Sequence, residues 1–166
     1  MPRDTRLQPP TIEYAPPAPG GAACAWRVRL GGATLDITPH RPGARIALAL
    51  GIDDAHPHMS GHAPASDTRG WCNALAMLTD ARLSIQPADE VELRSPMLVV
   101  DGIGYMALWR WLGSDASAMR LLVAPSPEEL IAGEETTILF VSADEVRALV
   151  AALAAAGAVA LGAPAE

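Results

Sequence analysis

MLVVDGIGYMALWRWL, residues 97–112, decides the fold class of this chain. Two apolar runs rich in strand-forming residues flank Asp101-Gly102, a pair that favours the tight turn of a β-hairpin. Along the second run, successive side chains point to opposite faces. One face holds Tyr105, Ala107, Trp109 and Trp111, and the other holds Met106, Leu108, Arg110 and Leu112. Because both faces are largely apolar, we expect a central strand, or a strand with a helix on one face and a partner on the other.

The same alternation predicts more strands on both sides of this hairpin. Residues 26–38 (WRVRLGGATLDIT) place two glycines between two alternating runs, which indicates a second hairpin. RIALAL at 45–50 predicts the strand that follows it. Further strands are predicted at 82–86, 119–124 and 136–142. A βαβ unit is the alternative for the last two strands, although the link between them is near the minimum length for such a unit.

Three segments carry helix signals. An apolar stripe at helical spacing predicts a helix that starts at 66–67, capped by the serine or the aspartate there, and runs to about Ala81. Residues 126–133 (SPEELIAG) hold the capping serine, the first-turn proline and the terminal glycine of a complete short helix. A capping box at 142–145 starts a last helix, which we expect to end near Gly157.

These elements predict an α+β fold in a single domain over 26–162. We expect a mostly antiparallel sheet of about six or seven strands, with two or three helices packed on it. Six prolines and a Gly-Gly pair in residues 1–25 indicate a flexible N-terminal arm. Residues 51–70 show no periodicity, so we expect a long irregular loop there, of the kind that is often functional.

Composition excludes several functions. The formal net charge is −7 and every basic residue is an arginine, scattered without a basic run, so we expect no nucleic-acid binding. The absence of lysine removes Schiff-base chemistry and the lysine of a phosphate-binding loop. No apolar run reaches the ~18 residues of a membrane span and no leader sequence is visible, so we expect no membrane contact and a cytoplasmic location. Two cysteines without a Cys-x-x-Cys motif fit a reducing compartment, and the Arg, Ala, Gly and Pro bias suggests a bacterial gene.

Residues 53–62 (DDAHPHMSGH) hold three of the four histidines of the chain. Pro57 biases the residue before it toward extended backbone, which would place the two flanking imidazoles on one side. Candidate ligands for a divalent metal are His56, His58, His62, Asp53 and Asp54. The His-x-His spacing resembles the first metal motif of cupins, but no histidine follows to supply the second motif. The alternative is a solvated loop, and we expect no resident cofactor.

GWCNALAML at 70–78 places Cys72 near the start of the predicted helix, where the helix dipole favours a thiolate. The string resembles the cysteine helix that opens papain-like peptidase domains, and this resemblance implies a catalytic thiol with a histidine downstream. No histidine follows His62, so that order is unavailable. An order with the base before the cysteine stays open, and its candidate bases are His40, His56, His58 and His62. The alternative is a buried structural cysteine.

The Trp109-Arg110-Trp111 segment indicates recognition of another chain, because tryptophan and arginine are enriched at interface hot spots. The predicted partner-binding residues are Tyr105, Trp109, Arg110 and Trp111. The alternative is that the two tryptophans pack under a helix in the core. We expect a small, acidic, non-catalytic module that binds another protein or itself as a homodimer, a physical type that includes secretion chaperones, adaptors and immunity-type inhibitors. The competing hypothesis is a metal-binding or Cys/His-dependent enzyme built on residues 53–72.

Overall fold

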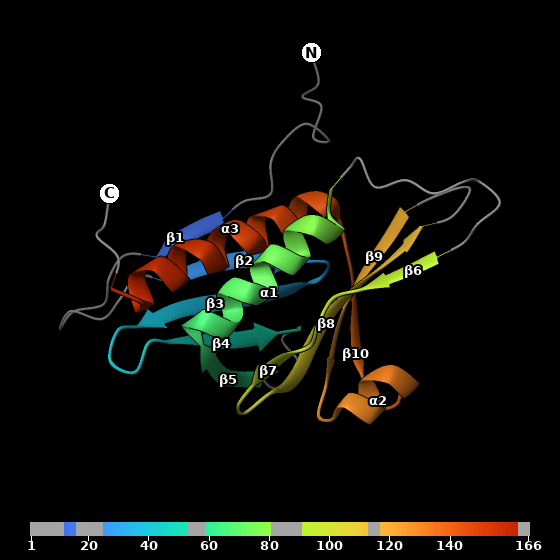
Figure 1. Ribbon diagram of the computed structural model, residues 1–166, viewed down its shortest axis with the longest axis horizontal. Helices are drawn as coiled ribbons and strands as arrows, with labels where there is room; N and C mark the ends of the chain where they lie inside the picture. The colour runs from blue at the N-terminus through green and yellow to red at the C-terminus, as the bar shows by residue number, and fades with distance from the viewer. Residues whose placement is uncertain (1–11, 16–24, 53–58, 81–90, 113–116, 163–166) are drawn as a thin grey trace, which may run out of the picture.

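The computed structural model describes residues 12–15, 25–52, 59–80, 91–112 and 117–162. These residues form two antiparallel β-sheets and three helices, so the α+β prediction is confirmed (Figure 1). The hairpins predicted at 26–38 and 97–112 are both present. Dividing the strands between two sheets is the main feature that the sequence patterns did not predict.

The first sheet contains five strands, each paired with the next along the chain. It consists of β1 (Ile12–Ala15), β2 (Ala25–Leu30), β3 (Ala33–His40), β4 (Arg45–Gly51) and β5 (Met59–Pro64). Gly31 makes the turn between β2 and β3 with a positive φ of 65°, a conformation that glycine adopts without steric cost. The regular burial alternation along β3 and β4 puts their apolar side chains on one face.

Two strands lie in segments that were predicted to be irregular or flexible. The strand β5 lies inside the segment 51–70 and a helix begins at Ala65, so the prediction of an irregular loop there is wrong for residues 59–70. The sequence MSGHAP has no apolar alternation, so it carries no strand signal. The strand forms because it pairs with β4. The strand β1 lies inside the predicted arm and pairs with β2 through a proline-free IEYA segment. For residues 1–11 and 16–24, outside the described residues, the arm stays a prediction.

The second sheet has β9 (Ser117–Ala124) and β8 (Gly104–Leu112) in its centre. At its borders lie β10 (Thr137–Val141), β6 (Val91–Arg94) and β7 (Leu98–Val100), and both β6 and β7 pair with β8. The strands β9 and β10 are antiparallel, so the βαβ alternative is wrong. The strand predicted at 82–86 lies outside the described residues.

The three helices are α1 (Ala65–Leu78), α2 (Pro127–Ala132) and α3 (Ala143–Ala160). Ser126 and Ser142 are the N-caps of α2 and α3, as predicted, and the capping box of α3 is complete. For the capping box also predicted at α2, the structure gives one bond, from the Glu129 N–H to the Ser126 side chain. The predicted side-chain cap of α1 is wrong, because β5 runs directly into the helix and the Ala65 N–H donates to the Ala44 carbonyl. The predicted end of the last helix near Gly157 is wrong, because α3 continues to Ala160. The glycine with a positive φ just after the helix is Gly162.

The helices α1 and α3 lie side by side across the apolar face of the first sheet (Figure 1). Their buried residues merge with that face and with one face of the second sheet into one hydrophobic core. A smaller cluster, centred on Leu130 of α2, lies on the opposite face of the second sheet. None of the described helices is long and apolar enough to cross a membrane.

Backbone hydrogen bonds join the two sheets directly at one edge. His62 of β5 and Asp101, in the turn between β7 and β8, exchange two backbone hydrogen bonds of 2.9 and 2.8 Å. Gly61 permits this approach, because a Cβ there would lie 2.2 Å from the Asp101 carbonyl oxygen. At the turn between β2 and β3, the Gly31 N–H donates to the Glu145 carboxylate over 3.1 Å, which ties the first sheet to the start of α3. The strand β8 itself is covered on one face by the main core and on the other partly by α2.

Candidate functional site

The outer face of the second sheet, on the side of α2, carries one row of aligned side chains across four strands. Direct cross-strand pairing places Arg94 of β6 opposite Trp109, Trp109 opposite Arg120 of β9, and Arg120 opposite Phe140 of β10. Residues paired in this way share a face of the sheet. Neighbouring rows add Trp111 and Ile138 to the same face. We call these residues the tryptophan face: Arg94, Trp109, Trp111, Arg120, Ile138 and Phe140.

Trp109 is the most buried residue of the tryptophan face, with only 7% of its surface exposed. The guanidinium carbon of Arg94 lies 4.1 Å from the centre of its ring, and that of Arg120 lies 5.6 Å away. Both distances fall within the range of a cation–π interaction. Glu92 fixes both cations, since its carboxylate accepts hydrogen bonds from Arg94, at 3.0 and 3.1 Å, and from Arg120. Three members of the row, Arg94, Trp109 and Arg120, are therefore held in place by contacts with one another and with Glu92.

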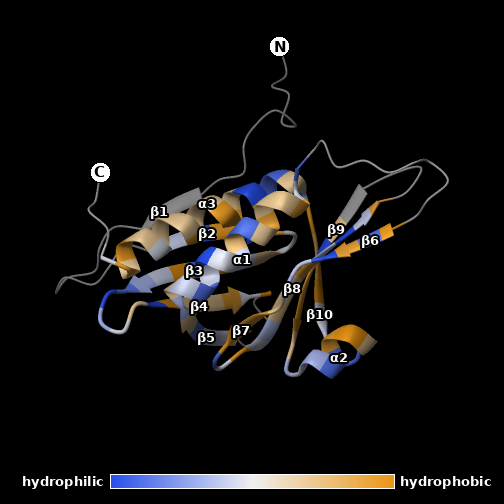
Figure 2. Ribbon diagram, in the orientation of Figure 1, coloured by the Kyte–Doolittle hydropathy of each residue, from blue (hydrophilic) through white to orange (hydrophobic). Residues whose placement is uncertain are grey.

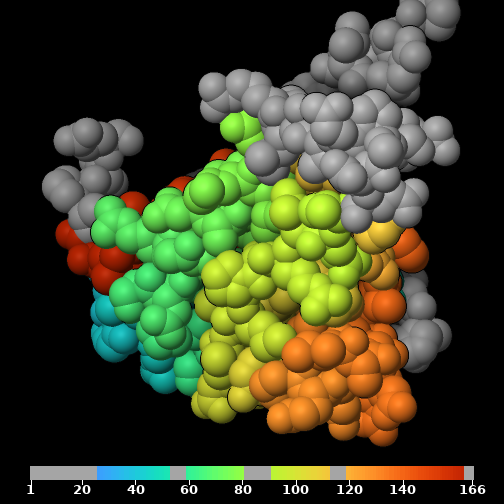
Figure 3. Space-filling view, turned by 45° about the vertical axis from the view of Figure 1, so that its right-hand side comes forward, coloured from blue at the N-terminus to red at the C-terminus, as the bar shows by residue number. Residues whose placement is uncertain are grey.

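Apolar side chains around this centre face solvent. Phe140 is 70% exposed and Trp111 is 37% exposed, and Ile138 is also exposed. Ile131 of α2 adds another exposed aliphatic group at the edge of the same side. Figure 2 shows hydrophobic ribbon on β6, β10 and α2 at this side of the molecule. Figure 3 brings it forward, with the orange atoms of α2 directly beside the yellow-green strands.

The structure brings together only part of the predicted partner-binding set. Trp109 and Trp111 belong to the tryptophan face, and Tyr105 lies partly buried on the same side against the small cluster under α2. Arg110 is buried on the opposite face, where its Nη1 donates to the carbonyls of Leu78 (2.6 Å) and Asp80 (3.0 Å). Its role is to hold the end of α1, so it is not part of this surface.

Sequence reasoning missed four residues of the tryptophan face: Arg94, Arg120, Ile138 and Phe140. The signal for the last two was present, because Ile138 and Phe140 alternate with buried residues in TTILFVS (136–142). The sequence does not give the register between β9 and β10, and this register is what places Ile138 and Phe140 near Trp109. Arg94 belongs to β6, a strand that the sequence patterns did not predict.

Cys72 is a buried structural thiol in this fold. It is 5% exposed, and its Sγ lies 3.9 Å from the Val150 carbonyl of α3, to which it donates. Burial raises the pKa of the Cys72 thiol to about 11, which disfavours the nucleophilic thiolate. The helix begins at Ala65, so Cys72 lies beyond the first turn, where the dipole would act. The expectation of a cysteine near the helix start is therefore wrong.

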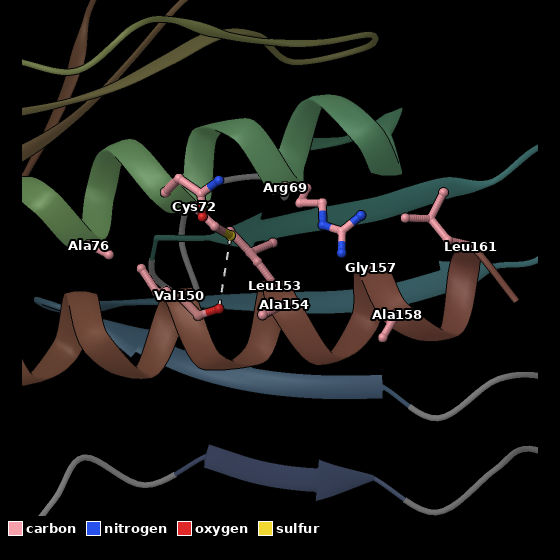
Figure 4. A pocket seen from close by; sticks show the side chains of 10 residues that line it. Arg69, Cys72, Ala76, Val150, Leu153, Ala154, Gly157, Ala158 and Leu161 are labelled. Carbon is pink, nitrogen blue, oxygen red and sulfur yellow. Dashed lines mark hydrogen bonds between the residues drawn. The ribbon is translucent and has the colours of Figure 1, made fainter. Parts of the chain in front are cut away.

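Beside Cys72, α1 and α3 leave a shallow groove of about 330 Å³ (Figure 4). Its walls are mostly small or apolar, including Ala76, Ala154 and Gly157, and the Arg69 side chain lies between Cys72 and Leu161. The described side chains place no histidine in this lining. A Cys/His pair at this groove is thus unsupported, since the sulfur faces a backbone carbonyl instead.

Of the predicted metal ligands, only His62 lies within the described residues. His56, His58, Asp53 and Asp54 lie outside them. The His62 Nε2 atom lies 3.4 Å from both the Asp101 carboxylate and an Arg45 nitrogen. Within the described ranges, no group of three or more His, Cys, Asp or Glu side chains could hold a metal ion. His40, another candidate base, is exposed at the end of β3.

The chain matches no family model, no curated protein and no solved structure. Its function is therefore inferred from the chemistry of the tryptophan face.

Proposed function

We propose that this chain is a non-catalytic protein-binding module whose contact surface is the tryptophan face. The observation that carries the proposal is Phe140, a phenylalanine 70% exposed at the end of the ordered row through Trp109. A large apolar side chain held at the surface of a sheet costs free energy in water unless another surface covers it. It is also the only phenylalanine of the chain.

The composition of this face supports protein recognition over other functions. Interface hot spots favour tryptophan and arginine at a centre that excludes water, with near-neutral contacts around them. Here Trp109 and its two arginines already form such a centre, so a partner would not need to order them. Phe140, Trp111 and Ile138 supply apolar area around that centre. Cys72 forms no disulfide within the described residues, which supports the proposal of a cytoplasmic location. The bias toward Arg, Ala, Gly and Pro supports the proposal of a bacterial source.

Site-specific photocrosslinking in the source cells tests the proposal. A photoreactive phenylalanine analogue is placed at Phe140 in one protein and, as a control, at the exposed Arg29 in another. We expect Phe140 to capture a protein chain and Arg29, on the outer face of the first sheet, to capture none. Adding Trp111→Arg to the chain that carries the analogue at Phe140 should abolish the crosslinked product. Equal capture from both positions, or none from Phe140, would contradict the proposal.

A further inference from the structure

We infer that the partner of the tryptophan face is a second copy of this chain, related by a twofold axis. The inference rests on the proposed function, because it names the protein that the same face binds. It is carried by the distribution of charge along the face.

One end of the face is basic. Arg94 and Arg120 both lie there, with side chains 50% and 29% exposed, and Glu92 is the one acid that pairs with them. Two guanidinium groups on one carboxylate leave a net positive charge. A basic end is unusual for this chain, whose formal net charge is −7.

The other end of the face is acidic. Leu130 anchors α2 on the second sheet next to Ala107, Leu122 and Ala124. On α2 and in the turn after it, Glu128, Glu134 and Glu135 are all exposed. Arg120 and Ala124 are four positions apart on β9, which separates the two ends by about 13 Å along the strand.

Exposed apolar groups lie near the basic row and between it and the acidic end. Ile138 pairs with Leu122 and Phe140 with Arg120, so the two side chains follow the face from the acidic end toward the basic end. Ile131 of α2 is exposed as well. The face therefore changes from acidic at α2 to basic at the row of Arg94 and Arg120, and the exposed side chains of Ile138 and Phe140 form an apolar strip along β10.

A twofold axis lying in the plane of the face, perpendicular to the strands, would turn this pattern onto itself. Each acidic end would then meet the basic end of the other copy, and the two apolar strips on β10 would lie antiparallel to each other. Every favourable contact would occur twice, as in any isologous interface. A foreign partner would need to offer the same arrangement of charge and apolar surface, whereas a second copy already carries it. Local attraction of this kind also offsets the repulsion between two acidic chains.

Sedimentation equilibrium of the purified full-length chain over a wide concentration range tests this arrangement. We expect a reversible dimer for the wild type and a monomer for Phe140→Asp, because that substitution removes the largest exposed apolar side chain of the strip and places a carboxylate there. A far-ultraviolet circular dichroism spectrum and melting temperature close to those of the wild type would show that Phe140→Asp still folds.

A matched pair of charge reversals tests the twofold geometry. Glu134→Arg places a cation opposite the basic end, so the dimer dissociation constant should rise about tenfold at low salt and less at high salt. Asp67→Arg makes the same charge change at an exposed position of α1 and should leave the constant unchanged. Equal effects of the two reversals would overturn the inference.

The remaining outcomes separate the inference from the proposed function. A wild type that stays monomeric at all concentrations overturns the inference. If Phe140 then still crosslinks to a different protein, the proposed function stands without it. If Phe140 captures nothing, both fail. A dimer that survives Phe140→Asp also overturns the inference, because its interface would lie elsewhere.

Discussion

The two sheets of this protein have similar inner faces and very different outer faces. The inner faces are both apolar and meet in one core with α1 and α3. The outer face of the first sheet carries threonines, alanines and an ion pair between Arg27 and Asp36 at 2.8 Å. The outer face of the second sheet carries the exposed Phe140 and Trp111 around Trp109. Inner faces are similar because folding requires apolar burial, so the difference between the outer faces indicates function.

The largest expected effect contrasts the two faces of the second sheet. Leu108 is 1% exposed on the inner face, so Leu108→Ala should lower the free energy of unfolding by about 3 kcal/mol, through lost burial and a new cavity. Phe140→Ala should change that free energy by less than about 0.5 kcal/mol in the monomer, because its side chain is mostly solvated. Urea unfolding of both variants below the concentration of any association checks the contrast. Similar losses would show that Phe140 belongs to the core and not to an interface.

The next effect concerns the contact that holds the two sheets together. Gly61→Ala would place a methyl group against the Asp101 carbonyl, and we expect a loss of about 2 kcal/mol as the backbone shifts. Gly70→Ala is the matched control, because a Cβ there meets nothing within 4 Å inside α1. It should stabilise the protein by about 0.5–1 kcal/mol through helix propensity. The melting temperatures of the two variants should therefore shift in opposite directions from that of the wild type. A neutral Gly61→Ala would mean that the sheets do not depend on this contact.

Local chemistry predicted the hairpins and the capped helices, because each depends on residues close in sequence. The capping box of Ser142 and Glu145 is such a case, and both of its hydrogen bonds form. The strand β5 could not be predicted in this way, because Gly61 and His62 are strand residues only through β4 and Asp101.

The residues of the candidate site also differ in whether the sequence could predict them. Trp109 and Trp111 were found because they lie together on one strand. Arg94, Arg120 and Phe140 come from three other strands, and only the registers of β6, β9 and β10 align them with Trp109. A surface assembled from four strands leaves no signal in any short segment. The loop residues 53–58 gave the more conspicuous motif, yet they lie outside the described residues.

The smallest expected effect tests whether the tryptophan face is ordered before binding. Arg94→Ala removes the cation that stacks on Trp109, and we expect a loss of about 1 kcal/mol from the cation–π contact and the ion pair together. Arg147→Ala is a matched control, since Arg147 is 52% exposed, against 50% for Arg94, and pairs with Asp144, with no aromatic ring of the described residues stacked on it. Its loss should stay below about 0.5 kcal/mol, as for other exposed pairs on a helix. Urea unfolding followed by tryptophan fluorescence measures both values. Because the ring supplies the difference between two equally exposed arginines, equal losses would mean that the row through Trp109 is no more ordered than an ordinary polar surface.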